Sequence, residues 1–145
     1  MAISRRAAAK QYKQMGVQTG VEQANPHRLV QMLMQGGLDK IARAKGALQR
    51  DMMPEMGNNI TGVISIIDAL RASLDIQTGG DLAANLHDLY NYMIKRLLRA
   101  NLDNDAEILD EVAELLRDIK SGWDAIPEHL RTNDRAVWYK SVAAQ

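Results

Sequence analysis

Histidine, aspartate and glutamate are the residues of this sequence that could bind a metal ion or transfer a proton. The three histidines, His27, His87 and His129, are far apart and lack the spacing of metal ligands. Di-metal sites in helical bundles need Glu-x-x-His pairs, and the sequence contains none. The carboxylates fall on the polar faces of predicted helices, where water solvates them. We therefore predict no catalytic residue, no metal site, no cofactor and no enzymatic activity.

Glycine-rich loops that hold phosphate groups are also missing from the sequence. It has neither a P-loop nor a dinucleotide-binding motif. The stretch Thr78–Gly80 could bind an anion at the start of a helix, but a turn between two helices is the simpler interpretation. A binding protein is therefore a better hypothesis than an enzyme.

The composition indicates one globular domain in a reducing compartment. The chain has 145 residues, of which 46% are apolar and 25% are charged, and it has no cysteine. The start of the chain lacks the apolar core of a secretory signal, and no apolar run is long enough to span a membrane. The formal net charge is zero, which disfavours binding to nucleic acid. We expect a cytoplasmic protein without membrane insertion.

Apolar spacing predicts four helices and no strand. Asn25 and Pro26 suit the start of the first helix, which should end before Pro54. Residues 51–59 are predicted to form a loop, with Asn58 or Asn59 capping a second helix. A turn at Gly79–Gly80 precedes a third helix over about 81–101, and a fourth helix begins near Asp105 and ends at Pro127. Short connections predict an all-α fold, an antiparallel up-down four-helix bundle over residues 25–127.

Two segments flank the predicted bundle. Residues 1–24 could form a short helix followed by an extended stretch, and residues 128–145 form a tail that could dock on the bundle or stay loose. Within the first helix, Gly36 and Gly37 favour close approach of another helix. The alternative is that they form the floor of a groove for a partner.

The third predicted helix carries more apolar residues than one packed face requires. Its main stripe consists of Leu82, Leu86, Leu89, Met93, Leu97 and Ala100. A second stripe beside it consists of Ala83, Tyr90, Ile94 and Leu98. The second predicted helix has a surplus residue, Ile66, beside its main face. If the two surpluses meet, they form an exposed apolar groove, which suits an amphipathic helix of a partner. The alternative is that the third helix simply contacts two neighbours within the bundle.

The order and spacing of several short motifs resemble one family. The motifs are Tyr12, VQT at 17–19, ANP at 24–26, LVQML at 29–33, SLD at 73–75, GG at 79–80, ANL at 84–86, LYNYM at 89–93, RLL at 96–98, AN at 100–101, ND at 104–105, EV at 111–112 and Trp123. Together they resemble the FliS family of flagellar secretion chaperones. Met34 stands where many members have tyrosine, and the tail after Pro127 extends beyond the pattern.

This resemblance implies a four-helix bundle that binds the disordered C-terminal region of flagellin in the cytoplasm and prevents premature polymerisation. It also implies delivery to an export gate component of the flagellar type III secretion apparatus. Some members bind an anti-sigma factor, and some form homodimers. In the family, an N-terminal segment can occupy part of the client site.

The stripes and the resemblance together give a set of candidate site residues. The predicted client-binding residues are Ile66, Leu70, Leu86, Tyr90, Ile94 and Leu98. Tyr12 and Val17 are the candidates for the N-terminal plug, and Leu86 could equally belong to the core. The alternative function is a helical adaptor or scaffold that binds an amphipathic helix of another partner.

Overall fold

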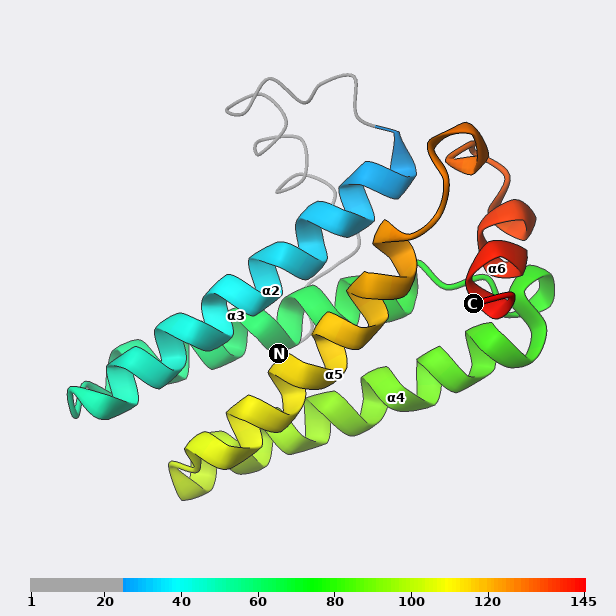
Figure 1. Cartoon of the computed structure of the whole chain (residues 1–145). Coiled ribbons are helices and arrows are strands. Elements are labelled where there is room, and N and C mark those ends of the chain that lie inside the picture. Colours follow the sequence, from blue (N-terminus) through cyan, green and yellow to red (C-terminus); the bar gives the residue numbers. More distant parts are fainter. Residues whose placement is uncertain (1–24) are drawn as a thin grey trace.

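The computed structural model describes residues 25–145, which form five α-helices and one short 3-10 turn (Figure 1). The elements are α2 (Pro26–Gln49), α3 (Met53–Ala72), α4 (Ile76–Asp103), α5 (Ala106–Asp124), η1 (Glu128–Leu130) and α6 (Arg135–Ala143). Helices α2 to α5 pack as an antiparallel bundle, in which α2 contacts α3 and α5, and α4 contacts the same two helices. The predicted all-α four-helix bundle is confirmed. Predictions about Tyr12, Val17 and the rest of residues 1–24 lie outside the described residues.

Polar side chains start three of the four bundle helices. Asn25 accepts a hydrogen bond from the amide of Arg28 at 2.8 Å, and Pro26 occupies the first helical turn, as predicted. Asp75 accepts from the amide of Thr78, and Asp105 accepts from the amide of Glu107. These caps fix where the chain enters each helix.

The predicted loop over residues 51–59 is wrong. Helix α3 begins at Met53 and takes Pro54 into its first turn, where the missing proline N–H would have had no partner in the helix. Asn59 does not cap the helix but donates to the carbonyl oxygen of Glu55 from within it, at 2.9 Å. The turn between α2 and α3 therefore shrinks to the residues around Asp51, whose φ is 57°.

Helix α4 is longer than predicted at both ends. Residues Ile76 to Gly79 form one helical turn, and Gly80 then interrupts the helix with φ 53° and ψ −133°. The predicted turn at Gly79–Gly80 thus becomes a kink, for which the positive φ requires glycine. The carboxylate of Asp75 accepts hydrogen bonds from both the amide and the hydroxyl of Thr78. A carboxylate of the chain itself thus takes the place that a bound anion would have at this helix start. This supports the interpretation of Thr78–Gly80 as a turn.

One continuous core joins the four bundle helices. Methionines fill much of it in place of phenylalanine, with Met34, Met56 and Met93 all fully buried. A β-carbon added to Gly37 would lie 2.9 Å from Cδ2 of Leu116 and 3.6 Å from Cγ2 of Ile66. The Gly36–Gly37 pair therefore allows close helix packing, as the favoured interpretation held, and Gly37 is buried rather than the floor of a groove.

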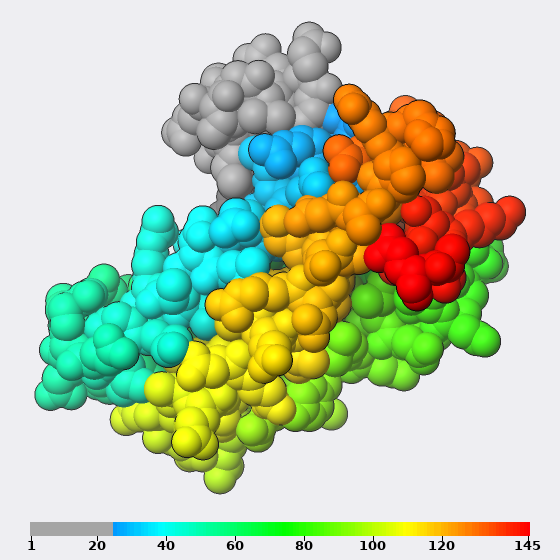
Figure 2. Space-filling view, in the orientation of Figure 1, coloured from blue at the N-terminus to red at the C-terminus, as the bar shows by residue number. Residues whose placement is uncertain are grey.

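The C-terminal tail docks on the bundle. After η1, helix α6 lies at the end of the bundle opposite the α2–α3 and α4–α5 connections, beside the first part of α4 (Figures 1 and 2). Trp138 and Tyr139 of α6 are both buried. The tail is thus an ordered layer over one end of the four helices.

Candidate helix-binding surface

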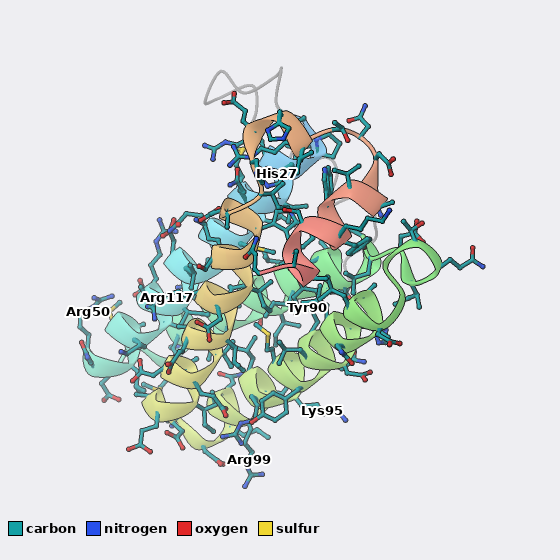
Figure 3. The ribbon with its side chains drawn as sticks, turned by 45° about the vertical axis from the view of Figure 1, so that its right-hand side comes forward. His27, Arg50, Tyr90, Lys95, Arg99 and Arg117 are labelled. Carbon is teal, nitrogen blue, oxygen red and sulfur yellow. The ribbon has the colours of Figure 1, made fainter. Side chains whose placement is uncertain are left out.

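The six predicted client-binding residues differ widely in exposure. Leu98 is 52% exposed and Ile94 is half-buried, whereas Tyr90 is only 2% exposed. Figure 3 shows Tyr90 on the inner side of α4, below α6, while Lys95 and Arg99 extend outward from the same helix. Ile66, Leu70 and Leu86 are also buried. The expectation of an exposed second stripe is therefore wrong for Tyr90 and correct for Leu98.

Tyr90 lies beneath the C-terminal helix. It shares a small cavity of about 40 Å³ with residues of four helices, among them Leu70, Trp123, Trp138 and Tyr139. Burial, and to a lesser degree the nearby Tyr139 hydroxyl, raises the pKa of Tyr90 well above its usual value. The phenol is therefore neutral and packs as a large core side chain, which the sequence pattern of α4 alone did not indicate.

Ile66 and the second stripe of α4 do not meet. Ile66 lies against two glycines of α2. A β-carbon added to Gly36 would be 3.7 Å from Cδ1 of Ile66, and one added to Gly37 would be 3.6 Å from its Cγ2. The side of α3 that faces α4 is marked instead by Arg71, which donates to Asn91 of α4. Ile66 is buried in the core against α2, whereas Leu98 is exposed, so Ile66 does not extend an exposed groove that includes Leu98.

Another apolar residue of α3, Ile64, lies on the side of that helix that faces α4. Gly57, Ile64 and Arg71 recur every seven residues, which places them along one side of α3. Gly57 lies near Asn101 of α4 and Arg71 binds Asn91, so Ile64 between them faces the same neighbour. Ile64 is half-buried. The seven-residue spacing shows from the sequence that the three residues share one side of α3, but only the contacts of Gly57 and Arg71 show that this side faces α4.

We call the resulting area the α3–α4 surface and define it by Ile64, Ile94, Leu98 and Leu102. Leu98 and Leu102 are 52% and 76% exposed, and one helical turn separates them. At one end, Arg71 donates hydrogen bonds to both Asp68 and Asn91. The side-chain Nδ2 of Asn91 also lies 3.3 Å from Nδ1 of His87. An apolar strip with a polar border of this kind suits the apolar face of a partner helix.

The opposite flank of α4 is held by a polar network to α5. Arg96 donates to Glu111 at 2.7 Å, and the Tyr92 hydroxyl donates to the same carboxylate at 2.8 Å. The hydrogen bond from Arg96, followed by the one from Tyr92, lowers the pKa of Glu111. Donation to Glu111 in turn raises the pKa of Tyr92. The network joins this flank of α4 to α5.

The histidines do not come together. His27 is buried, with Nε2 2.8 Å from the carbonyl oxygen of Trp123, and His87 and His129 lie on other elements. Among residues 25–145, no three histidine, aspartate or glutamate side chains are grouped as metal ligands. In the same part of the chain, no helix combines the length and hydropathy needed to cross a bilayer.

Comparison with known proteins identifies relatives over most of the chain. The profile of the family described as flagellar protein FliS matches residues 8–130. Flagellar secretion chaperone FliSB of Pseudomonas aeruginosa is 54% identical over 119 residues, covering 82% of this chain and 94% of the relative. Flagellar secretion chaperone FliS of Vibrio cholerae is 39% identical over 84% of this chain and 90% of its own. The corresponding protein of Salmonella typhimurium is 42% identical over 81% of this chain and 87% of its own. Helix α6 begins after the matched family region ends.

Proposed function

The chain belongs to the FliS family of flagellar secretion chaperones, and we propose that it binds the disordered C-terminal region of flagellin in the cytoplasm. Binding would prevent premature polymerisation, and the complex would be delivered to the export gate of the flagellar type III secretion apparatus. Family membership supports the proposal, and the observation that carries it in this chain is the exposed apolar strip along α4.

The α3–α4 surface supplies what a folding client requires. A disordered segment that becomes helical loses conformational entropy worth several kcal/mol, which apolar burial must offset. Leu98 alone would contribute about 1 kcal/mol, since about half of its side chain is available for burial. A wrapped client on the order of 2,000 Å² would add many such contacts. The surface thus binds a client by the same apolar packing that stabilises the bundle.

Substitution of Leu98 tests this proposal. Leu98→Asp places a carboxylate in the middle of the strip, so it should weaken binding of a flagellin C-terminal peptide at least about tenfold in calorimetric titration. Ile76→Asp is the matched control, because Ile76 is 46% exposed at the far end of the same helix and lies outside the strip. Both variants should keep the helical circular dichroism spectrum.

Two outcomes would contradict the proposal. Equal affinity of the Leu98→Asp variant and the wild type would remove the α3–α4 surface from the binding site. If the wild type does not bind flagellin but binds an amphipathic helix of another protein, the chain acts instead as a helical adaptor.

A further inference from the structure

Helix α6 covers an apolar surface that four bundle helices build together. The cavity at this contact is lined by Val30 of α2, Leu70 of α3, Tyr90 of α4 and Trp123 of α5, with the exposed Pro26 of α2 at its edge. We call this area the end surface and define it by those five residues. In Figure 2, α6 and the turn before it form the outer layer at this end of the molecule. Without α6, the end surface would expose a broad apolar area to water, which a soluble protein seldom leaves uncovered.

Two side chains place α6 on this surface. The Tyr139 ring lies against Gly79, and its hydroxyl accepts a hydrogen bond from the amide of Asp75 at 3.0 Å. Arg135 donates to the carbonyl oxygen of Ser73. Both bonds go to backbone atoms just before α4. They fix the register of α6 over the end surface with few polar contacts.

The aromatic part of the contact leaves polar atoms without partners. Trp138 packs edge-on against both His27 and Trp123, with ring centroids 5.9 Å and 6.1 Å apart. Within residues 25–145, no hydrogen-bond partner reaches the buried Nδ1 of His27 or the buried Nε1 atoms of Trp123 and Trp138. Of these atoms, Nε1 of Trp138 belongs to α6, and its burial without a protein partner makes docking less favourable than a fully paired contact would be.

Helix α6 is short, and the chain just before it is held to the bundle by contacts of its own. It has nine residues, too few for a stable helix alone, so its helical form depends on docking. The segment before it stays anchored, because Arg131 donates to the carbonyl oxygens of Ile126 and Asp124, and Asn25 donates to that of Arg131. Residues 132–134 then act as the hinge. The family match ends at residue 130, so α6 lies outside the region that the family profile matches.

We propose that the end surface is a second client-binding site, which α6 occupies in the free chain and which an amphipathic client helix takes over when α6 undocks. Aliphatic side chains of the client would replace Trp138 and Tyr139 over Leu70 and Tyr90. This inference rests on the proposed function, and it gives the buried pair Leu70 and Tyr90 a role that their low exposure otherwise excludes. Leu98 and Leu102 of the α3–α4 surface are exposed while α6 is docked, so that surface does not depend on the undocking of α6.

A reversible disulfide between α5 and α6 tests the exchange. A β-carbon on Gly122 would lie 3.6 Å from Cγ1 of Val142, so side chains at these two positions contact each other across the α5–α6 contact. The chain has no native cysteine, so Gly122→Cys with Val142→Cys creates a unique pair. The oxidised protein keeps α6 docked, and the reduced protein allows α6 to undock when a client competes for the end surface. Comparing the two forms of one full-length variant controls for the substitutions themselves.

The oxidised form should bind a flagellin C-terminal peptide at least about tenfold more weakly than the reduced form in calorimetric titration. Trp138 leaves the contact together with α6, whereas the client covers Trp123, so saturating peptide should shift the fluorescence of Trp138 to longer wavelength only in the reduced form. Val142→Cys alone, alkylated, is the control for the change at position 142 and should bind like the reduced pair.

The outcomes separate the two proposals. Equal, measurable affinities of the oxidised and reduced forms would overturn the exchange of α6 while leaving flagellin binding intact. Absence of peptide binding by both forms would overturn the proposed function and this inference together. Amide exchange of the wild type gives an independent reading, since α6 amides should exchange much faster than those of α3 and α4. Protection of α6 equal to that of the bundle core would also overturn the proposal.

Discussion

Gly79→Ala should release α6 from the bundle. The added β-carbon would lie 2.5 Å from Cβ of Ala83 and 2.9 Å and 3.0 Å from two ring carbons of Tyr139. Non-bonded carbon atoms need about 3.5 Å, so the Tyr139 ring must move away. The ring cannot move inward, because it is 6% exposed and already packed against the core. Its displacement also breaks the hydrogen bond from the Asp75 amide.

The magnitude follows from two opposing effects. Overpacking of this kind costs about 1–3 kcal/mol, while replacing a helical glycine by alanine gains about 1 kcal/mol. The contact with Ala83 lies within α4 and is the same whether or not α6 is docked, whereas the two contacts with Tyr139 exist only in the docked state. The share of the cost that falls on the docked state is therefore about 1–2 kcal/mol. The ratio of undocked to docked α6 should therefore rise about tenfold.

Amide exchange and tryptophan fluorescence measure this ratio. In Gly79→Ala, the α6 amides should exchange about tenfold faster than in the wild type, and the fluorescence should shift to longer wavelength as Trp138 meets water. Gly36→Ala is the matched control, since its β-carbon would have only an ordinary 3.7 Å contact with Ile66. That variant should be stabilised by about 0.5–1 kcal/mol. The reasoning is refuted if Gly79→Ala exchanges and fluoresces like the wild type.

Two further predictions concern the bundle and its pH dependence. Gly37→Ala should lower the free energy of unfolding in urea by about 1 kcal/mol, because its β-carbon would lie 2.9 Å from the buried Leu116, and an increase would contradict the close packing. Burial lowers the pKa of His27, against the opposing effect of its hydrogen bond to the Trp123 carbonyl. The unfolded chain then takes up the proton first, so stability should fall as pH decreases below about 6.5. Urea unfolding at pH 7.5 and 5.5 should show this fall in the wild type and a smaller one in His27→Gln, and identical falls would contradict it.

The charged groups around His27 support the direction of this pH effect. Arg131 and Arg28 disfavour its protonation, whereas Asp124 favours it more weakly than burial opposes it. A carbonyl oxygen can only accept, so Nε2 carries the proton of the neutral ring and protonation would add a second N–H at the unpartnered Nδ1. Carboxylates with a lowered pKa, such as Glu111, also contribute to the free energy of unfolding. That contribution is lost only at lower pH, as the pH falls below about 4.5.

The helices of the bundle were predictable because their signals are local. The cap at Asn25, the acidic start at Asp105 and the glycine requirement at Gly80 depend on neighbours within a few residues, and each appears in the structure. The error at residues 51–59 arose because Pro54 can either end one helix or begin the next, and spacing alone did not decide between them.

The sequence by itself determined the all-α bundle, the close approach at Gly37, the exposed position of Leu98 and the resemblance to a chaperone family. Only the tertiary structure decided that Ile66 faces α2, that Ile64 lies on the α4 side and that α6 covers Tyr90. The physical reason is that helical periodicity gives the direction of a side chain around its own axis. Which neighbour lies in that direction depends on how all the helices pack together, including a tail that the repeating pattern does not reach.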